Sequence, residues 1–278
     1  MFGIAAGLRR PAVPAMVPVL AAIGALGVES LAVAAFRTLQ IAGFYAFGTR
    51  LPPTVELVTV VGYALAMLFA FGSARWRGVV AAVALFGIVW GEQFWLGLSG
   101  RLIFCERSGI PCDVLALAWP DLWPKLLGIA IGVVAGRVVR HGAPGVVALA
   151  LGVGLFALSA SIGRIAFVPL LGANPVGEAV QGAINTITAV QLMGAVAGGF
   201  VVGFLAKRRI FAALVLVLYF IGPWWPQLLT FRDSPRPLIL AIDWRLLTPV
   251  GYVLVAVLSL VVGAVVARYR ATSIPTIP

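Results

Sequence analysis

Apolar segments long enough to cross a membrane recur along the whole chain, separated by short clusters of basic residues. An α-helix needs about 20 mostly apolar residues to span the hydrocarbon core of a bilayer. Of the 278 residues, 62% are hydrophobic and only 10% are charged, whereas soluble domains have about 25% charged residues. The sequence therefore predicts an all-α, polytopic integral membrane protein. We expect about eight spans, at residues 12–35, 54–74, 78–98, 124–140, 143–168, 187–206, 210–230 and 248–267.

The basic clusters predict how these helices are oriented. Cytoplasmic loops of membrane proteins are enriched in Lys and Arg, so we expect the loops with basic clusters and both termini to be cytoplasmic. The other connections are longer, carry Pro and Trp, and are expected to form amphipathic arms and loops on the outer face of a cytoplasmic (inner) membrane. The clusters lie at every second connection: Arg9-Arg10, Arg75/Arg77, Arg137/Arg140 with His141, Lys207-Arg208-Arg209 and Arg268/Arg270.

Composition also limits the function classes. A net charge of +11 would suggest nucleic acid in a soluble protein, but here the basic residues follow the membrane topology, and no nucleic-acid partner is expected. His141 is the single histidine, which argues against histidine-ligated metals and bis-histidine haem. Two cysteines are too few for a structural zinc site. We therefore expect no metal site.

The two cysteines, Cys105 and Cys112, lie in "RLIFCERSGIPCD", a loop predicted to be on the outer face. That compartment is oxidising, and the turn at Gly109-Ile110-Pro111 could bring the sulfur atoms together. We expect a disulfide, which would contribute about 2.5 kcal/mol on a loop-entropy estimate. Free thiols are the first alternative. A catalytic cysteine is the second, although no histidine is expected on this side to favour the thiolate.

Two charged residues fall inside or near the end of apolar segments. They are Arg164 in "SASIGRIAFVPLLG" and Glu92 in "VWGEQFW". Charges at such depth are costly and usually face a partner or a polar cavity. One interpretation is a structural ion pair. The other is an outward-opening cavity in which Arg164, Arg101 and Arg232 hold an anionic headgroup, because guanidinium donates paired hydrogen bonds to phosphate.

Glycines at a spacing of four residues predict close contacts between helices, because small residues let helix backbones approach each other in lipid. A glycine-lined substrate groove is the alternative. The glycines concerned are Gly128, Gly132 and Gly136, then Gly194 with Gly198, and Gly199 with Gly203.

Four short motifs follow one another in a recognisable order. The chain has Tyr63 in "VVGYALAMLFAFGSARWR", Gly100-Arg101-Leu102 in "GLSGRLIF", Gly163-Arg164-Ile165 with Phe167 in "SIGRIAFVPLLGANP", and Phe231-Arg232-Asp233 in "LYFIGPWWPQLLTFRDSP". From about residue 54 to residue 270, this order and the basic loops resemble bacterial prolipoprotein diacylglyceryl transferase. Residues 54–278 would be the seven-helix core of that family, and residues 1–53 an additional N-terminal helix with an outer-face arm.

The sequence departs from the family at several motif positions. The family's histidine-glycine motif is replaced by "WPDLWPKLLGIAIG", which has no histidine, and Ala166 precedes Phe167 where the family has asparagine. The glutamate expected soon afterwards is absent, since Glu178 comes later, and the late arginine and glutamate are replaced by apolar residues around Trp225 and Leu229. The chain would be a divergent member.

The resemblance implies transfer of a diacylglyceryl group from phosphatidylglycerol to the cysteine thiol of a prolipoprotein at the outer leaflet, without a cofactor. Tyr63 and Arg164 would be catalytic, and Arg101, Arg164 and Arg232 would bind the headgroup. The reaction needs a proton acceptor. Candidates for this acid/base role are Glu92, Glu106 and Asp121, and their spacing does not distinguish them.

Three function hypotheses therefore remain open. The first is a divergent lipid-group transferase whose partners are a membrane phospholipid and a prolipoprotein. The second is a non-catalytic relative that binds a lipid or lipopeptide as a subunit of a membrane complex. The third is a small-molecule permease, for which the matched discontinuous helices of such proteins are not evident in the sequence.

Overall fold

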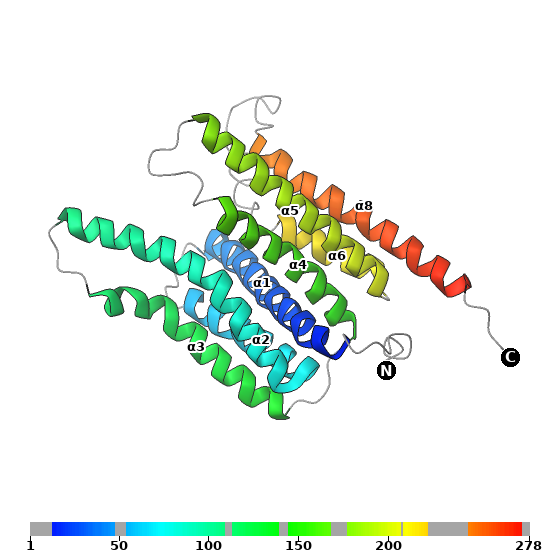
Figure 1. Ribbon diagram of the computed structural model, residues 1–278, viewed down its shortest axis with the longest axis horizontal. Coiled ribbons are helices and arrows are strands. Elements are labelled where there is room, and N and C mark those ends of the chain that lie inside the picture. Colours follow the sequence, from blue (N-terminus) through cyan, green and yellow to red (C-terminus); the bar gives the residue numbers. More distant parts are fainter. Residues whose placement is uncertain are drawn as a thin grey trace.

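The computed structural model describes residues 13–47, 54–108, 113–138, 144–167, 177–206, 208–221 and 244–273 (Figure 1). These residues form seven α-helices: α1 (Val13–Phe47), α2 (Thr54–Ser108), α3 (Val114–Val138), α4 (Pro144–Phe167), α5 (Gly177–Leu205), α6 (Arg209–Ile221) and α8 (Trp244–Ser273). Six segments are long and apolar enough to cross a membrane: Met16–Phe36, Glu56–Gly91, Leu117–Val138, Gly145–Ile165, Gly182–Leu205 and Val250–Ala271. The predicted all-helical, multi-pass architecture is confirmed at this level.

Helix α2 is a hairpin of two antiparallel segments. Ala74 (φ −139°, ψ 18°) and Arg75 (φ 56°, ψ −143°) leave the helical conformation, and the chain reverses there. The rings of Tyr63 and Phe86 lie 5.1 Å apart, whereas an uninterrupted helix would separate these residues by about 35 Å. The turn falls between the predicted segments 54–74 and 78–98.

The helices pack in an order that differs from the chain order. Helix α3 packs on α2, α2 on α1, α1 on α4, α4 on α5, and α5 on α8, which also contacts α6 (Figure 1). One buried core cluster joins α1 to both segments of α2, and includes the fully buried Met67. A second joins α4, α5, α6 and α8, and includes the fully buried Val202. Helix α1 therefore lies between two packed groups of helices.

Glycines make the closest helix contacts, as the sequence predicts. A methyl group on Gly128 or Gly132 would overlap the backbone of α2, and one on Gly199 or Gly203 would overlap the backbone of α8. The spacing of these glycines did not predict the contact between α1 and α4. There, Gly27 lies against Ala150 and Gly154 lies against Ile23.

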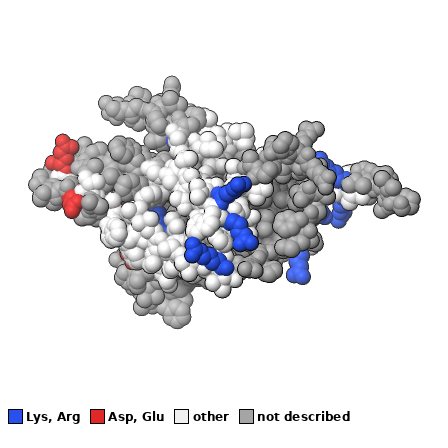
Figure 2. Space-filling model, turned by 60° about the horizontal axis from the view of Figure 1, so that its bottom comes forward, with Lys and Arg blue, Asp and Glu red and all other residues white. Residues whose placement is uncertain are grey.

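Charge is distributed unevenly over the bundle. In Figure 2, the Lys and Arg side chains gather in the middle and toward the right of the face shown, and acidic side chains lie at the left end. Arg137 lies over the Trp76 ring, with its Cζ 5.2 Å from the centroid, and Arg209 Nε donates a hydrogen bond to the Gly203 carbonyl oxygen at 3.2 Å. These contacts bring the basic ends of neighbouring helices together.

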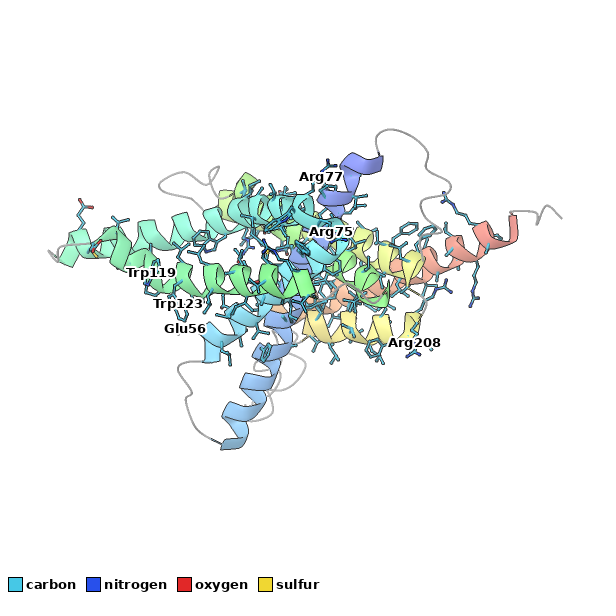
Figure 3. All side chains as sticks on the ribbon, turned by 90° about the horizontal axis from the view of Figure 1, so that it is seen from below. Glu56, Arg75, Arg77, Trp119, Trp123 and Arg208 are labelled. Atoms are coloured by element: carbon cyan, nitrogen blue, oxygen red, sulfur yellow. The ribbon has the colours of Figure 1, made fainter. Side chains whose placement is uncertain are left out.

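The other end of the bundle has acidic and aromatic residues. Glu56, Trp119 and Trp123 lie toward the left in Figure 3, and Arg208 lies toward the right. Trp119 is 54% exposed near the start of α3, a position typical of a tryptophan at a membrane–water interface.

Candidate functional site

A polar cavity of about 210 Å³ lies where α1, α2, α4 and α6 meet. Its lining is unusual for an apolar bundle, because it carries a carboxylate, a guanidinium and several hydroxyl groups. The polar residues are Glu29 and Ser30 of α1, Tyr63 of α2, Ser161 and Arg164 of α4, and Tyr219 of α6; Phe86, Trp90 and Phe156 add aromatic rings.

Arg164 is placed in the cavity by the last turn of α4. Its Nε atom is buried and has no hydrogen-bond partner among the residues that the structure describes. A buried guanidinium N–H without a partner costs free energy unless a ligand or water completes it. Arg164 therefore has unused donor capacity at the cavity.

Ser161 lies one helical turn before Arg164 and is only 2% exposed. Its Oγ donates a hydrogen bond to the Ala157 carbonyl oxygen at 3.1 Å. Ser161 lines the cavity, and because its single hydroxyl proton is used inside the helix, its oxygen can act there only as an acceptor.

Helix α1 brings Glu29 and Ser30 to the same place. The hydroxyl groups of Ser30 and Tyr219 are hydrogen-bonded, which ties α1 to α6. Glu29 is close enough to act electrostatically on Tyr63 and on Tyr219. The carboxylate therefore belongs to the same polar cluster as both tyrosine hydroxyls.

Lys125 of α3 lies beside the cavity. Its Nζ is 4.5 Å from the centroid of the Trp90 ring, and Trp90 lines the cavity. Two carboxylates act on this ammonium group, Asp121 more strongly than Glu29. Asp121 and Lys125 are four residues apart on one helix, the spacing at which opposite charges pair.

The structure brings together two of the residues that the sequence singled out. Tyr63 and Arg164 line the same cavity although 101 positions separate them in the numbering (164 − 63). The side chains of Glu92 and Arg101, and all of Arg232, lie outside the described part of the chain. Their predicted roles stay predictions.

The other acid/base candidates do not line this cavity. Glu106 is exposed near the end of α2, and Asp121 is exposed on α3, where it acts on Lys125. Cys105 is half-buried in the last turns of α2. Cys112 lies outside the described residues, so its pairing with Cys105 stays a prediction.

Sequence reasoning missed Glu29, Trp90 and Tyr219. A signal for Glu29 was present, since it is a lone carboxylate in the apolar stretch "GALGVESLAV" of the first segment. Ionisable residues inside a span mark polar sites as a rule. Trp90 and Tyr219 carried no comparable signal, because aromatic residues are common throughout apolar spans.

No family model, curated protein or solved structure matches the chain. The resemblance to prolipoprotein diacylglyceryl transferase therefore stays a hypothesis that rests on the short motifs quoted above.

Proposed function

We propose that this membrane protein binds the headgroup of a phospholipid in the cavity between α1, α2, α4 and α6, with the phosphate held by Arg164. The observation that carries the proposal is the buried Arg164 Nε, which lines a polar cavity and has no partner among the described residues. A phosphate diester offers an anionic oxygen to that donor, and guanidinium matches phosphate geometry.

The size of the cavity supports the proposal that it holds only the headgroup of the phospholipid. Its volume of about 210 Å³ is below the roughly 300–1,000 Å³ of sites that enclose drug-sized ligands. A small polar group fits this space, and the acyl chains would remain among the apolar surfaces of the helices. Such surfaces are abundant here, for example Leu214 and Leu218 of α6, which are 57% and 68% exposed.

The binding proposal is tested by native mass spectrometry of the purified protein. The unchanged protein is expected to keep one phospholipid at collision energies that remove loosely attached lipid, and Arg164→Gln is expected to lose it. Arg208→Gln is the matched control, because Arg208 is an exposed arginine immediately before α6. Equal retention by Arg164→Gln and the unchanged protein would rule out the proposed role of Arg164.

Diacylglyceryl transfer is the second candidate function, favoured by the presence of Tyr63 and Arg164 in one cavity. In that reaction the acceptor sulfur attacks the glycerol carbon, the bond from that carbon to the phosphate oxygen breaks, and glycerol phosphate leaves. Glu29 would accept the thiol proton, the role for which Glu92, Glu106 and Asp121 were considered. If the protein catalyses this transfer, the purified protein given phosphatidylglycerol and a lipobox peptide should yield the thioether of the peptide. If the protein retains lipid but does not convert the peptide, the non-catalytic binding function is left.

We also propose that the chain crosses the membrane eight times, with both termini in the cytoplasm of a bacterial cell. The turn at Ala74-Arg75 supports two spans within α2, and the apolar α6 supports another. The gathering of basic residues at one end of the bundle supports the orientation.

Cysteine labelling tests this topology in a variant without the native cysteines. A single cysteine in place of Glu56 should react with an impermeant maleimide on intact cells. One in place of Arg208 should react only after permeabilisation. The reverse pattern would invert the proposed orientation.

A further inference from the structure

We propose that the basic end of the bundle carries a second lipid site, in which Arg75, Arg77 and Arg137 bind the phosphate of an anionic phospholipid beside the exposed ring of Trp76. The lipid belongs to the leaflet that faces this end of the bundle. None of these residues lines the cavity that contains Arg164, so the inference does not depend on the proposed function.

The reversal of α2 and the end of α3 bring the three arginines together. Arg75 and Arg77 flank Trp76 at the turn between the two segments of α2 (Figure 3). Arg137 comes from the last turn of α3, and its Cζ lies 5.2 Å from the centroid of the Trp76 ring. Three arginines therefore lie at one indole ring.

These arginines have no carboxylate near them along their own helices. No Asp or Glu occurs in the sequence between Glu56 and Glu92, or between Asp121 and Glu178. Asp121 and Arg137 are about 24 Å apart along α3, which is beyond the reach of an ion pair. All three arginines are exposed, and their charge is not balanced within α2 and α3.

The same asymmetry holds for the whole chain. Eleven of the 20 Lys and Arg residues form the five basic clusters, and the other nine (20 − 11) equal the acidic residues in number, so the clusters account for the net charge of +11. An excess of Lys and Arg orients a membrane protein with little contribution from Asp and Glu. Topology alone therefore does not require that these connections lack acidic residues, whereas binding of an anion favours it.

Trp76 indicates that the anion is a lipid headgroup. Its ring is 49% exposed and packs edge-on against Phe71, with the ring centroids 5.7 Å apart. An exposed indole at the end of a membrane helix lies at the depth of the headgroups. One turn further into the bundle, Val80 of α2 and Val134 of α3 are 66% and 63% exposed. The surface thus offers guanidinium groups for the phosphate and apolar side chains for the acyl chains.

The backbone of Arg75 also supports a binding role. Its φ of 56° and ψ of −143° lie in a region that glycine usually occupies, although Gly72 and Gly78 are close by in the sequence. Residues held in such conformations cluster at ligand-binding and active sites. The turn itself does not need an arginine at this position, so its side chain accounts for its presence.

The test is native mass spectrometry of the full chain in detergent, titrated with phosphatidylglycerol or phosphatidylcholine of defined acyl mass. The site is open to the surface, so its lipid exchanges with the added lipid. The unchanged protein should bind phosphatidylglycerol on the order of tenfold more tightly than phosphatidylcholine. One arginine near an anionic headgroup contributes about fivefold in affinity. The triple variant Arg75→Gln/Arg77→Gln/Arg137→Gln should therefore bind phosphatidylglycerol on the order of 100-fold more weakly.

Arg75→Gly separates binding from folding. Glycine adopts the positive φ of this position without steric cost, so the thermal midpoint of the protein should not fall, while the affinity for phosphatidylglycerol should fall about fivefold. Arg208→Gln is the charge-matched control. Arg208 is another exposed arginine of the basic end and lies apart from Arg75 and Arg77 in Figure 3, so this variant should bind like the unchanged protein.

Equal affinity of the unchanged protein for the two lipids would overturn the second site. Unchanged binding of phosphatidylglycerol by the triple variant would also overturn it. If Arg164→Gln lost the added lipid and the triple variant kept it, the lipid would belong to the cavity, and only the proposed function would stand.

Glycerol phosphate and a hexaglutamate peptide form the last arm of the experiment. Both should bind much more weakly than phosphatidylglycerol, because they have no acyl chains to place on the apolar helix surfaces. Glycerol phosphate affinity equal to that of the lipid would overturn the membrane as the source of the phosphate. Tighter binding of the peptide than of the lipid, lost in the triple variant, would make an acidic protein segment the partner and overturn the lipid.

Discussion

Arg164 occupies the last turn of α4, where the C-terminal end of a helix favours a positive charge. That position explains how an arginine is tolerated near the end of an apolar helix. It does not explain the buried Nε without a hydrogen-bond partner among the described residues, since an arginine that only neutralises a helix end can extend to water. The cavity beside it accounts for both observations.

The sequence was informative about individual charges and uninformative about their neighbours. Arg164 stood out because an arginine in an apolar segment is rare, and Tyr63 was indicated by a motif resemblance. Their presence in one cavity depends on the reversal of α2 and on the contact of α1 with α4. Neither is encoded in the spacing of the residues themselves.

Arg75 shows a local conformation that its residue type does not predict. It is the only described non-glycine residue with a positive φ, at 56° with ψ −143°, a region that glycine usually occupies. Two glycines, Gly72 and Gly78, lie close by in the sequence, and either is a more conventional site for the turn. The basic cluster predicted where the helix breaks, but not which residue adopts the strained geometry.

At the scale of helices, α5 and α8 depend on glycine for their contact. A methyl group on Gly203 would overlap the backbone of Leu260, and one on Gly199 would overlap that of Ala256. Gly203→Ala is therefore expected to separate the helices and to destabilise the protein by about 1–3 kcal/mol, the usual cost of overpacking. The measurement is the thermal midpoint of the purified protein, followed by fluorescence-detected size exclusion.

Gly87→Ala is the control for that substitution. Gly87 has nothing within 4 Å of the position that a Cβ would take, and alanine is the better helix former by about 1 kcal/mol. Its thermal midpoint should equal or exceed that of the unchanged protein. Equal stability of the Gly203 and Gly87 variants would show that close backbone approach does not hold α5 against α8.

The glycine spacing predicted which helix faces are close-packed, but not their partners. Gly128 and Gly132 contact α2, and Gly199 and Gly203 contact α8. A repeat of small residues identifies a face that accepts any closely approaching backbone. Which helix packs against that face depends on the lengths of the connections and on the shapes of all other helix faces. The packing order of the helices could therefore be learned only from the structure.

At the scale of the whole molecule, α1 is central to the described bundle. It packs between α2 and α4 and supplies Glu29 and Ser30 to the cavity. The proposed division into residues 1–53 and a core at residues 54–278 stays a prediction. In either case, the candidate site combines one helix from the first part with three from the second.

The central claim, that a phospholipid occupies the cavity, is tested most directly by photo-crosslinking in cells whose lipids carry radioactive phosphate. A benzophenone amino acid replaces Trp90, which lines the cavity, or Leu214, which is 57% exposed on α6. We expect phospholipid to be captured at both positions, and Arg164→Gln to reduce capture several-fold at the Trp90 position only. Absence of labelled lipid at the Trp90 position, or capture there that Arg164→Gln leaves unchanged, would contradict the account.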